Sequence, residues 1–270
     1  MKGESMLGKS NKVLNKLGRM SKAEEWLSTL SNNKEYAEAI KNCIVTYSTW
    51  KVEECVPVQM KYGTTKVSVF NNDVCVCAKV ATAHANAGDK VCVLDFASYR
   101  NPGGGFLKGA VAQEESLCGM SGLFPILNNQ KDIYERRLLL DNFDTVYNDD
   151  MFYCQDVPFM VNSNKMFNVD VIVAAAPNKS NSKVRKAFSN DEVIAILRHR
   201  MELVYLIPYL FGANTLLLGA WGCGVFGNDV EVVAKHWNFL SKDRYNGLYK
   251  TVIHPVLDIE QYKIFKKICH

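Results

Sequence analysis

The chain has 270 residues, of which 48% are hydrophobic, enough to bury one substantial α/β core. Its formal net charge is +4, so the composition requires neither nucleic acid nor a membrane surface as a partner, although it does not oppose a polyphosphate ligand. No charged leader precedes an apolar segment, and no apolar run reaches the roughly 18 residues of a membrane-spanning helix. The sequence therefore predicts neither secretion nor membrane insertion.

The nine cysteines are odd in number and scattered, and no two of them form a Cys-x-x-Cys pair. This usage is typical of reduced thiols, so we expect an intracellular protein of the cytoplasm or nucleus. Cys75 and Cys77 have the wrong spacing for a zinc knuckle, and neither His84 nor Cys92 completes a site. No bound metal is therefore expected.

The first 62 residues lie outside any motif and are predicted to form a helical extension or cap. Residues 1–20 lack a sustained apolar face, whereas Ser21 and Glu24 match a capping box that would begin a helix. A second helix is predicted from Lys34 to Tyr47, where apolar residues recur at helical spacing. Basic residues crowd this end of the chain, at Lys2, Lys9, Lys12, Lys16, Arg19 and Lys22. A solvated leader explains them more simply than an arm that steers a polyanion.

Residues 63–270 are predicted to form one α/β domain. Strands are expected at 66–70, 91–96, 151–154, 169–175, 215–220 and 248–253, and helices at 74–87, 132–140, 191–209, 230–240 and 259–269. The strand, helix, strand order over 66–96 indicates a right-handed crossover and a largely parallel sheet. The polar segment 178–190 is predicted to be a loop, and Arg198 and Arg200 are predicted to be surface charges.

A glycine-rich loop leaves the strand at 91–96 and leads into a helix. Three glycines at 103–105 follow Pro102, and glycine lets the backbone adopt unusual conformations and touch a ligand through its amides. The segment Gln113-Glu114-Glu115 then begins the helix with two adjacent carboxylates. Taken separately, a glycine triplet is usually a turn, and paired glutamates are usually a solvated helix end that favours the dipole.

A second glycine loop follows the strand at 215–220 and contains Gly-Cys-Gly-Val-Phe-Gly at 222–227. Asn228 and Asp229 then cap the helix at 230–240. A strand that passes through glycines into a helix N-terminus presents unpaired amides to an anion, which suits a diphosphate. Both loops leave strands at the edge where open α/β sheets bind ligands.

Together, the two loops resemble the signature of the poly(ADP-ribose) glycohydrolases, a catalytic branch of the macrodomain fold. The resemblance rests on Gly-Gly-Gly before Gln-Glu-Glu, on Gly-Cys-Gly-Val-Phe-Gly, and on the flanking pairs Asn101-Pro102, Phe106-Leu107, Gly109-Ala110 and Ser116-Leu117. These flanks are similar to the microbial, bacterial-like type, and the resemblance covers about residues 65–258. Asn228-Asp229 stands where many microbial members have Asn-Pro, which exchanges a proline of the first helical turn for a capping acid. The resemblance implies a macrodomain-like three-layer α/β/α fold with a mostly parallel, mixed sheet.

The resemblance also implies a hydrolase that cuts the ribose–ribose O-glycosidic bond of poly(ADP-ribose), releases ADP-ribose and reverses ADP-ribosylation. Such a bond breaks through an oxocarbenium-like state, so an acid must protonate the leaving oxygen. The catalytic acid of the family, its second glutamate, corresponds to Glu115, and the glutamate that holds ribose hydroxyls corresponds to Glu114. A helix N-terminus favours an ionised Glu115, so we expect burial, Glu114 and the ligand's phosphates to restore the proton in the liganded site.

The other expected site residues surround these two carboxylates. Gln113 is expected to bond across the loop or to the ribose, and Phe226 to stack on the distal ribose or adenosine. Ser98 and Asn101 are candidates for hydroxyl or base contacts. The loops complete the expected binding set with Gly103, Gly104, Gly105, Gly222, Cys223, Gly224, Val225 and Gly227. No cofactor and no metal are expected to take part, and the protein is expected to act as a monomer.

Two other functions stay open on the sequence. One is a macrodomain reader that binds ADP-ribose without cutting it, which the paired Glu114 and Glu115 disfavour because a reader does not need an acid beside the glycines. The other is a hydrolase of single ADP-ribosyl groups on protein or nucleic acid, or of a free ADP-ribosyl metabolite. The sequence does not separate polymer from single units as the substrate.

Overall fold

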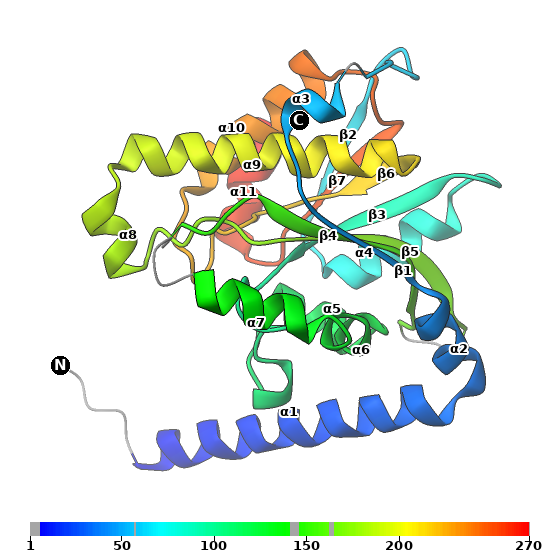
Figure 1. The fold of residues 1–270 in the computed structure, drawn as a ribbon, viewed down its shortest axis with the longest axis vertical. Helices are drawn as coiled ribbons and strands as arrows, with labels where there is room; N and C mark the ends of the chain where they lie inside the picture. The colour runs from blue at the N-terminus through cyan, green and yellow to red at the C-terminus, as the bar shows by residue number, and fades with distance from the viewer. Residues whose placement is uncertain (1–5, 57, 141–145, 162–164, 270) are drawn as a thin grey trace.

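The structure is a computed structural model that describes residues 6–56, 58–140, 146–161 and 165–269. A sheet crosses the middle of the molecule, and helices cover both of its faces (Figure 1). Its strands are Ile44–Thr49 (β1), Lys66–Phe70 (β2), Lys90–Phe96 (β3), Asp150–Phe159 (β4), Phe167–Ala174 (β5), Ala213–Leu217 (β6) and Thr251–Pro255 (β7). They lie in the order β1-β4-β5-β3-β6-β7-β2. The β1–β4 and β4–β5 pairs are antiparallel and the other pairs are parallel, so the predicted mostly parallel, mixed sheet is confirmed.

Two helical layers complete the predicted three-layer arrangement. One face of the sheet carries α3 (Val52–Cys55), α9 (Asn190–Leu210), α10 (Val230–Phe239) and α11 (Ile259–Ile268). The other face carries α1 (Met6–Asn32), α2 (Lys34–Asn42), α4 (Val74–Ala83), α5 (Gln113–Cys118), α6 (Leu123–Asn128) and α7 (Lys131–Leu140). Shorter helical segments are η1 (Phe106–Lys108), α8 (Ser182–Ala187) and η2 (Leu240–Arg244). None of the helices in these described ranges is both long enough and apolar enough to cross a membrane.

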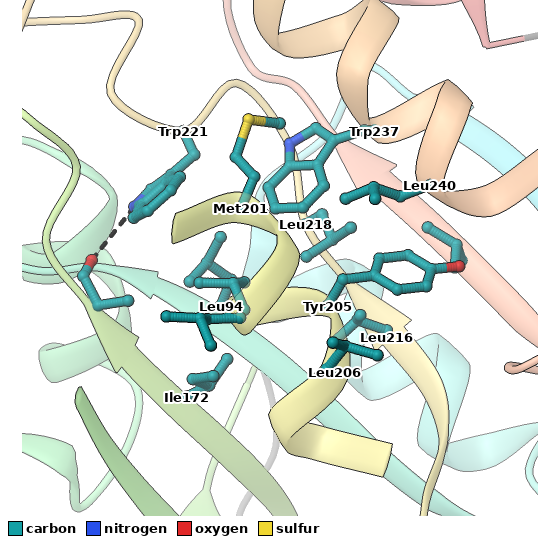
Figure 2. Close-up of a cluster of buried hydrophobic side chains, with 14 of the residues drawn as sticks. Leu94, Ile172, Met201, Tyr205, Leu206, Leu216, Leu218, Trp221, Trp237 and Leu240 are labelled. Atoms are coloured by element: carbon teal, nitrogen blue, oxygen red, sulfur yellow. Dashed lines mark hydrogen bonds between the residues drawn. The ribbon is translucent and has the colours of Figure 1, made fainter. Parts of the chain in front are cut away.

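Strand β3 lies in the centre of the sheet and is buried on both faces. Cys92 and Leu94 contribute to the hydrophobic cluster under α9 and α10, whereas Val91 and Val93 contribute to the cluster under α4 and α5. Side chains alternate along a strand, so a strand covered on both faces has a nearly continuous apolar sequence. Figure 2 shows the first cluster, in which Met201 lies between Trp221 and Trp237. This packing fixes the strand from which the first glycine loop departs.

The N-terminal segment differs from its prediction in two respects. Helix α1 runs without a break from Met6 to Asn32, so the expected helix start at Ser21 is wrong. The second helix ends at Asn42, and residues 44–49 form β1 instead of continuing the helix. Pairing with β4 overrides the helical spacing there, because β-branched and aromatic residues fit a strand better than a helix. The division at residue 62 stays a prediction, although β1 adds a strand from that segment to the sheet; Lys2 lies outside the described residues.

Two further elements were not predicted correctly. The segment 178–190 contains α8, which Asn181 caps by accepting a hydrogen bond from the Lys183 amide. Helix α9 begins with a complete capping box between Ser189 and Glu192, whereas Asp191 was the expected cap. A six-residue helix and a two-position shift of a cap lie below what apolar spacing resolves.

Candidate active site

The site lies where three neighbouring parallel strands end. β5, β3 and β6 are adjacent, and their carboxyl ends lead into the segments that follow Ala174, Phe96 and Leu217. The Ala97 amide donates a hydrogen bond to the Ala174 carbonyl at 3.2 Å, and the Trp221 indole donates to the same carbonyl at 3.1 Å (Figure 2). The two glycine loops therefore depart from one edge of the sheet, as expected for a ligand site in this class of fold.

The three glycines of the first loop are required by close packing. At Gly104, where φ is +59°, a Cβ atom would lie 2.6 Å from Glu115 Oε1 and 2.7 Å from Glu114 Oε2. At Gly103, where φ is +66°, it would lie 2.6 Å from the Phe124 ring, and at Gly105 it would lie 2.6 Å from the Ala110 Cβ. Any other residue would push the carboxylates or the loop apart.

Gln113 fixes the start of α5 to the end of β3. Its Nε2 donates to the Leu94 carbonyl at 2.7 Å, and its Oε1 accepts from the Phe96 amide at 2.9 Å. These bonds continue the strand's hydrogen-bonding pattern with a side chain and hold the two glutamates over the strand end. Of the two expectations for Gln113, the structure shows a bond within the protein, while a bond to ribose stays a prediction.

Each glutamate has one fixed oxygen and one unpartnered oxygen. Glu115 Oε1 accepts from the Gly105 amide at 2.7 Å, and Glu114 Oε2 accepts from the Ser98 amide at 2.7 Å. Glu115 Oε2 and Glu114 Oε1 are buried and have no hydrogen-bond partner among the described residues. Buried polar atoms are normally bonded, so this pair of oxygens is suited to receive groups from a ligand.

A third carboxyl lies beneath the pair and was not predicted from the sequence. Asp95, the second-last residue of β3, is fully buried, and neither of its oxygens has a partner among the described residues. Burial raises its pKa, and the negative charge of Glu115 raises it further. Burial also raises the pKa of Glu114, with a further contribution from Asp95 and an opposing one from the Ser98 amide. The available signal was an acid within an otherwise apolar buried strand.

The second glycine loop uses its amides differently. The amides of Trp221, Cys223, Gly227 and Asn228 are bonded to carbonyls of the same loop. The three successive amides of residues 224–226 have no hydrogen-bond partner in the described part of the chain. Gly224 and Val225 are exposed, and Val225 is 83% exposed. Consecutive free amides form a concave anion site.

Asp229 and Asn228 stabilise this loop from its far end. Asp229 accepts from the amides of Glu231 and Val232, so the N-terminus of α10 is already capped. An anion would therefore meet the loop amides rather than the helix terminus that was expected. The Asn228 side chain, 5% exposed as a residue, donates to the carbonyls of Pro177 at 2.9 Å and of Gly222 at 3.1 Å. It joins the loop to the segment that follows β5.

An aromatic group connects the two loops. Tyr99, just before the glycines, stacks on Tyr147 with ring centroids 4.5 Å apart, and Tyr147 contacts the Phe226 ring at 6.5 Å. Tyr147 has a φ of +68°, which is rare for an aromatic residue and indicates that its surroundings enforce the conformation. Phe226 is half-buried against this pair, so its position is fixed while part of the ring stays accessible.

Two buried arginines hold this aromatic group. Arg137 pairs with Asp150 at 2.8 Å and lies over the Tyr99 ring, 4.7 Å from its centroid. Arg200 bonds Asp149 at 2.8 Å and donates to carbonyls of residues 146, 147 and 175. Arg200 is 2% exposed, so its prediction as a surface charge was wrong, whereas Arg198 is exposed as predicted. The burial of the Arg200 charge is offset by Asp149 and by three carbonyls, all from segments distant from Arg200 in sequence, so the local sequence does not indicate it.

The remaining predicted residues lie around the same site. The Ser98 hydroxyl accepts from the amides of Arg100 and Asn101, and the Asn101 carbonyl accepts from the Gly104 amide at 3.0 Å. Burial, with a smaller contribution from Asp229, raises the pKa of Cys223 to about 12, so its thiol stays protonated. Within the described residues, no group of three or more His, Cys, Asp or Glu side chains is arranged to hold a metal ion. The roles in substrate binding stay predictions.

Comparisons with known proteins point to one family. The family model of the microbial-type PARG catalytic domain matches residues 17–162, more than half of the chain. The structure is similar to poly(ADP-ribose) glycohydrolase (PARG) from Thermomonospora curvata, with a TM-score of 0.81 and 27% identity over 93% of this chain and 98% of that one. The same enzyme bound to the inhibitor ADP-HPD matches with a TM-score of 0.78, 27% identity and the same coverage.

A second bacterial enzyme gives a similar match. PARG from Deinococcus radiodurans in complex with ADP-ribose has a TM-score of 0.73 and 27% identity over 86% of this chain and 95% of that one. No curated protein sequence matches the chain. The family match and the shared architecture agree with the site described above. The chain belongs to the microbial-type PARG catalytic-domain family, and it is a glycosidase of the poly(ADP-ribose) glycohydrolase class.

Proposed function

We propose that this protein removes ADP-ribose from poly(ADP-ribose), with Glu115 as the general acid and base. The observation that carries the proposal is the hydrogen bonding and burial of the two Glu115 carboxylate oxygens. One oxygen is fixed by the Gly105 amide, and the other is buried without a partner beside a loop that only glycine can form. A carboxyl group held in this way can meet a glycosidic oxygen with little loss of side-chain freedom.

The reaction needs a proton at the leaving oxygen and support for positive charge on the departing sugar. Glu115 Oε2 would give its proton to the ribose oxygen as the glycosidic bond breaks. The carboxylate that remains would then take a proton from water as the water oxygen bonds to the anomeric carbon. This step returns the proton to Glu115 and leaves two hydroxyl groups where one bond was hydrolysed.

Glu114 and Asp95 would support the acid. Glu114 Oε1, buried and unpartnered, would accept hydrogen bonds from ribose hydroxyls, which are the groups that the family assigns to its first glutamate. Burial raises the pKa of Asp95, so a protonated Asp95 would not repel the carboxylate that Glu115 becomes once it has given up its proton. Two ionised carboxylates at close range would instead repel each other.

The second loop would hold the diphosphate of the same ADP-ribose unit. The free amides of residues 224–226 supply donors, and the Phe226 ring supplies an apolar face for the distal ribose or adenosine. Two alternatives change the substrate or the chemistry: hydrolysis of single ADP-ribosyl groups, and binding of ADP-ribose without hydrolysis. The unpartnered glutamate oxygens favour hydrolysis over simple binding.

A Glu115→Gln variant tests the proposal with polymer as the substrate. Turnover of automodified, chain-labelled polymer should fall by about 10²–10⁴-fold, while binding of ADP-ribose stays close to that of the wild type. Glu135→Gln is the matched control, because Glu135 is exposed on α7. Equal turnover of singly modified protein would support the first alternative, and binding without any turnover in the wild type would support the second.

A further inference from the structure

Helix α1 carries basic side chains on the side that faces the catalytic loop. In its second half, Ala23 and Leu30 pack against the body of the protein and are each 2% exposed. Helical spacing places Arg19 and Lys16, four and seven residues before Ala23, on that same side. The contacts agree: Arg19 Nε donates to the Gly109 carbonyl at 2.8 Å, and Lys16 packs against Gly109.

The leucines of this part of α1 do not pack inward. Leu14 is 62% exposed and Leu17 is 54% exposed, although the Met20 side chain lies against the catalytic loop. A surface helix usually turns its leucines inward, so basic residues here share the inner side that leucines normally occupy. Lys16 and Arg19 are exposed, as the predicted solvated leader requires, but the bond from Arg19 keeps them beside the catalytic loop.

The charge is also unfavourable for the helix itself. The sequence from Met6 to Ala23 contains five basic residues and no acidic one, at the end of the helix where the dipole favours acids. Among the described residues, no carboxylate lies within ion-pairing distance of Lys16, Arg19 or Lys22. Basic residues at a helix N-terminus that no ion pair offsets are expected mainly where a function requires them.

These charges adjoin the loop that positions Glu115. Gly109 contacts α1, and the next residue, Ala110, donates its amide to the Gly105 carbonyl at 3.1 Å. Gly105 in turn holds Glu115. Lys108, exposed at the end of η1, adds a further cation beside the same loop. Lys16, Arg19 and Lys108 form what we call the cationic face.

We propose that the cationic face binds phosphates of the polymer units next to the unit being cleaved. The inference rests on the proposed function, because poly(ADP-ribose) carries a diphosphate in every unit and only one of these can occupy the second glycine loop. A polyanion that enters beside the first glycine loop has the charge that complements Lys16, Arg19 and Lys108. The cationic face would therefore favour long polymer over short oligomers and single ADP-ribose units.

The test is a double charge reversal, Lys16→Glu with Lys108→Glu, which leaves the bond from Arg19 to Gly109 in place. Its matched control is Lys266→Glu with Lys267→Glu on α11, on the opposite face of the sheet, where the change in net charge is the same. Binding of end-labelled long polymer and of a single fluorescent ADP-ribose unit, which has no neighbouring unit, is measured by fluorescence anisotropy in a Glu115→Gln background. We expect about tenfold weaker binding of long polymer and unchanged binding of the single unit. The slope of the logarithm of polymer affinity against the logarithm of salt concentration should become smaller by about 1.4, from about 0.7 for each of two phosphate contacts.

Three outcomes would overturn the inference. Equal binding by the variant and the control would remove any role for the cationic face. Equal loss for polymer and for the single ADP-ribose unit would show damage to the catalytic loop instead. Binding of single-stranded DNA as tight as that of polymer, and equally sensitive to the two reversals, would identify nucleic acid as the occupant. The binding measurement needs no turnover, so failure of the proposed function, seen as wild-type protein that leaves polymer intact, is distinguishable.

Discussion

The two glycine loops look alike in sequence and differ in what their backbones do. In the first loop, the amides of Gly104 and Gly105 are bonded to protein oxygens, and the glycines serve to let two carboxylates approach the main chain. In the second loop, three successive amides are left unbonded within the described residues, at an exposed position. One loop positions acids and the other presents donors. Both loops contain glycines with positive φ and no room for a Cβ, but in the first loop the space is taken by the two glutamates, whereas at Gly222 it is taken by Asn228 and Ala176.

The largest effect should follow from adding a methyl group to the first loop. Gly104→Ala would place a Cβ within 2.7 Å of both glutamate side chains at a φ of +59°. We expect kcat/KM to fall by about 100-fold or more, because a shift near 1 Å in a catalytic group costs about that much. Steady-state kinetics with polymer and a thermal melt measure the effect. A near-normal rate in a folded variant would show that the carboxylates do not need this approach.

A smaller effect is expected at the clamp of the second loop. Asn228→Ala removes both hydrogen bonds from the side chain to the carbonyls of Pro177 and Gly222. The amides of residues 179 and 228 still donate to these carbonyls, so the variant loses the two side-chain bonds alone, at about 0.5–1.5 kcal/mol each. We expect the loosened loop to raise KM about 5- to 100-fold while kcat changes little. Isothermal titration with ADP-ribose and steady-state kinetics separate the two. A fall in kcat at constant KM would place Asn228 with the first loop instead.

The pH dependence of stability should distinguish the acid cluster from the second loop. Burial raises the pKa of Asp95 above its ordinary value of 3.8, so the folded state binds a proton that the unfolded state has lost. This contribution is complete below about pH 4 and is lost as pH rises toward the folded pKa. Asp95→Asn should therefore flatten the decline of Tm with rising pH and raise Tm at pH 8, where each kcal/mol corresponds to about 2–4 °C.

Thermal melts from pH 5 to 9 check this expectation, with Asp132→Asn on the exposed surface of α7 as the control. Glu114 keeps a contribution of the same sign in both variants, because burial raises its pKa as well. Parallel curves for the wild type and Asp95→Asn would mean that Asp95 is ionised in the folded protein.

The comparison also shows how far the sequence leads. Both loops, the strands that carry them and the two glutamates follow from glycine spacing and apolar runs, because these signals are local. Local sequence does not show which loop positions carboxylates and which presents free amides. Whether the Gly105 amide faces a ligand or Glu115 depends on how α5 packs on β3. Asp95 was missed for the same reason, since its burial comes from that packing. The basic residues of α1 could not be placed beside the catalytic loop until the bond from Arg19 to the Gly109 carbonyl was known.

The smallest effect should come from a glycine in the second loop that has open space where a side chain would be added. An added Cβ at Gly224 would find no atom within 4 Å, and Gly224 is not among the glycines with positive φ. Gly224→Ala should therefore fold normally and change kcat/KM by less than about threefold, because a methyl group leaves the amides of residues 224–226 in place. Gly222→Ala is the matched contrast, since its Cβ would lie 2.6 Å from the Asn228 side chain and 2.7 Å from the Ala176 Cβ at a φ of +72°. The same kinetic assay applies to both variants. If Gly224→Ala lost activity as severely as Gly104→Ala, a bound ligand would have to fill the space beside Gly224 as closely as the glutamates fill the space beside Gly104.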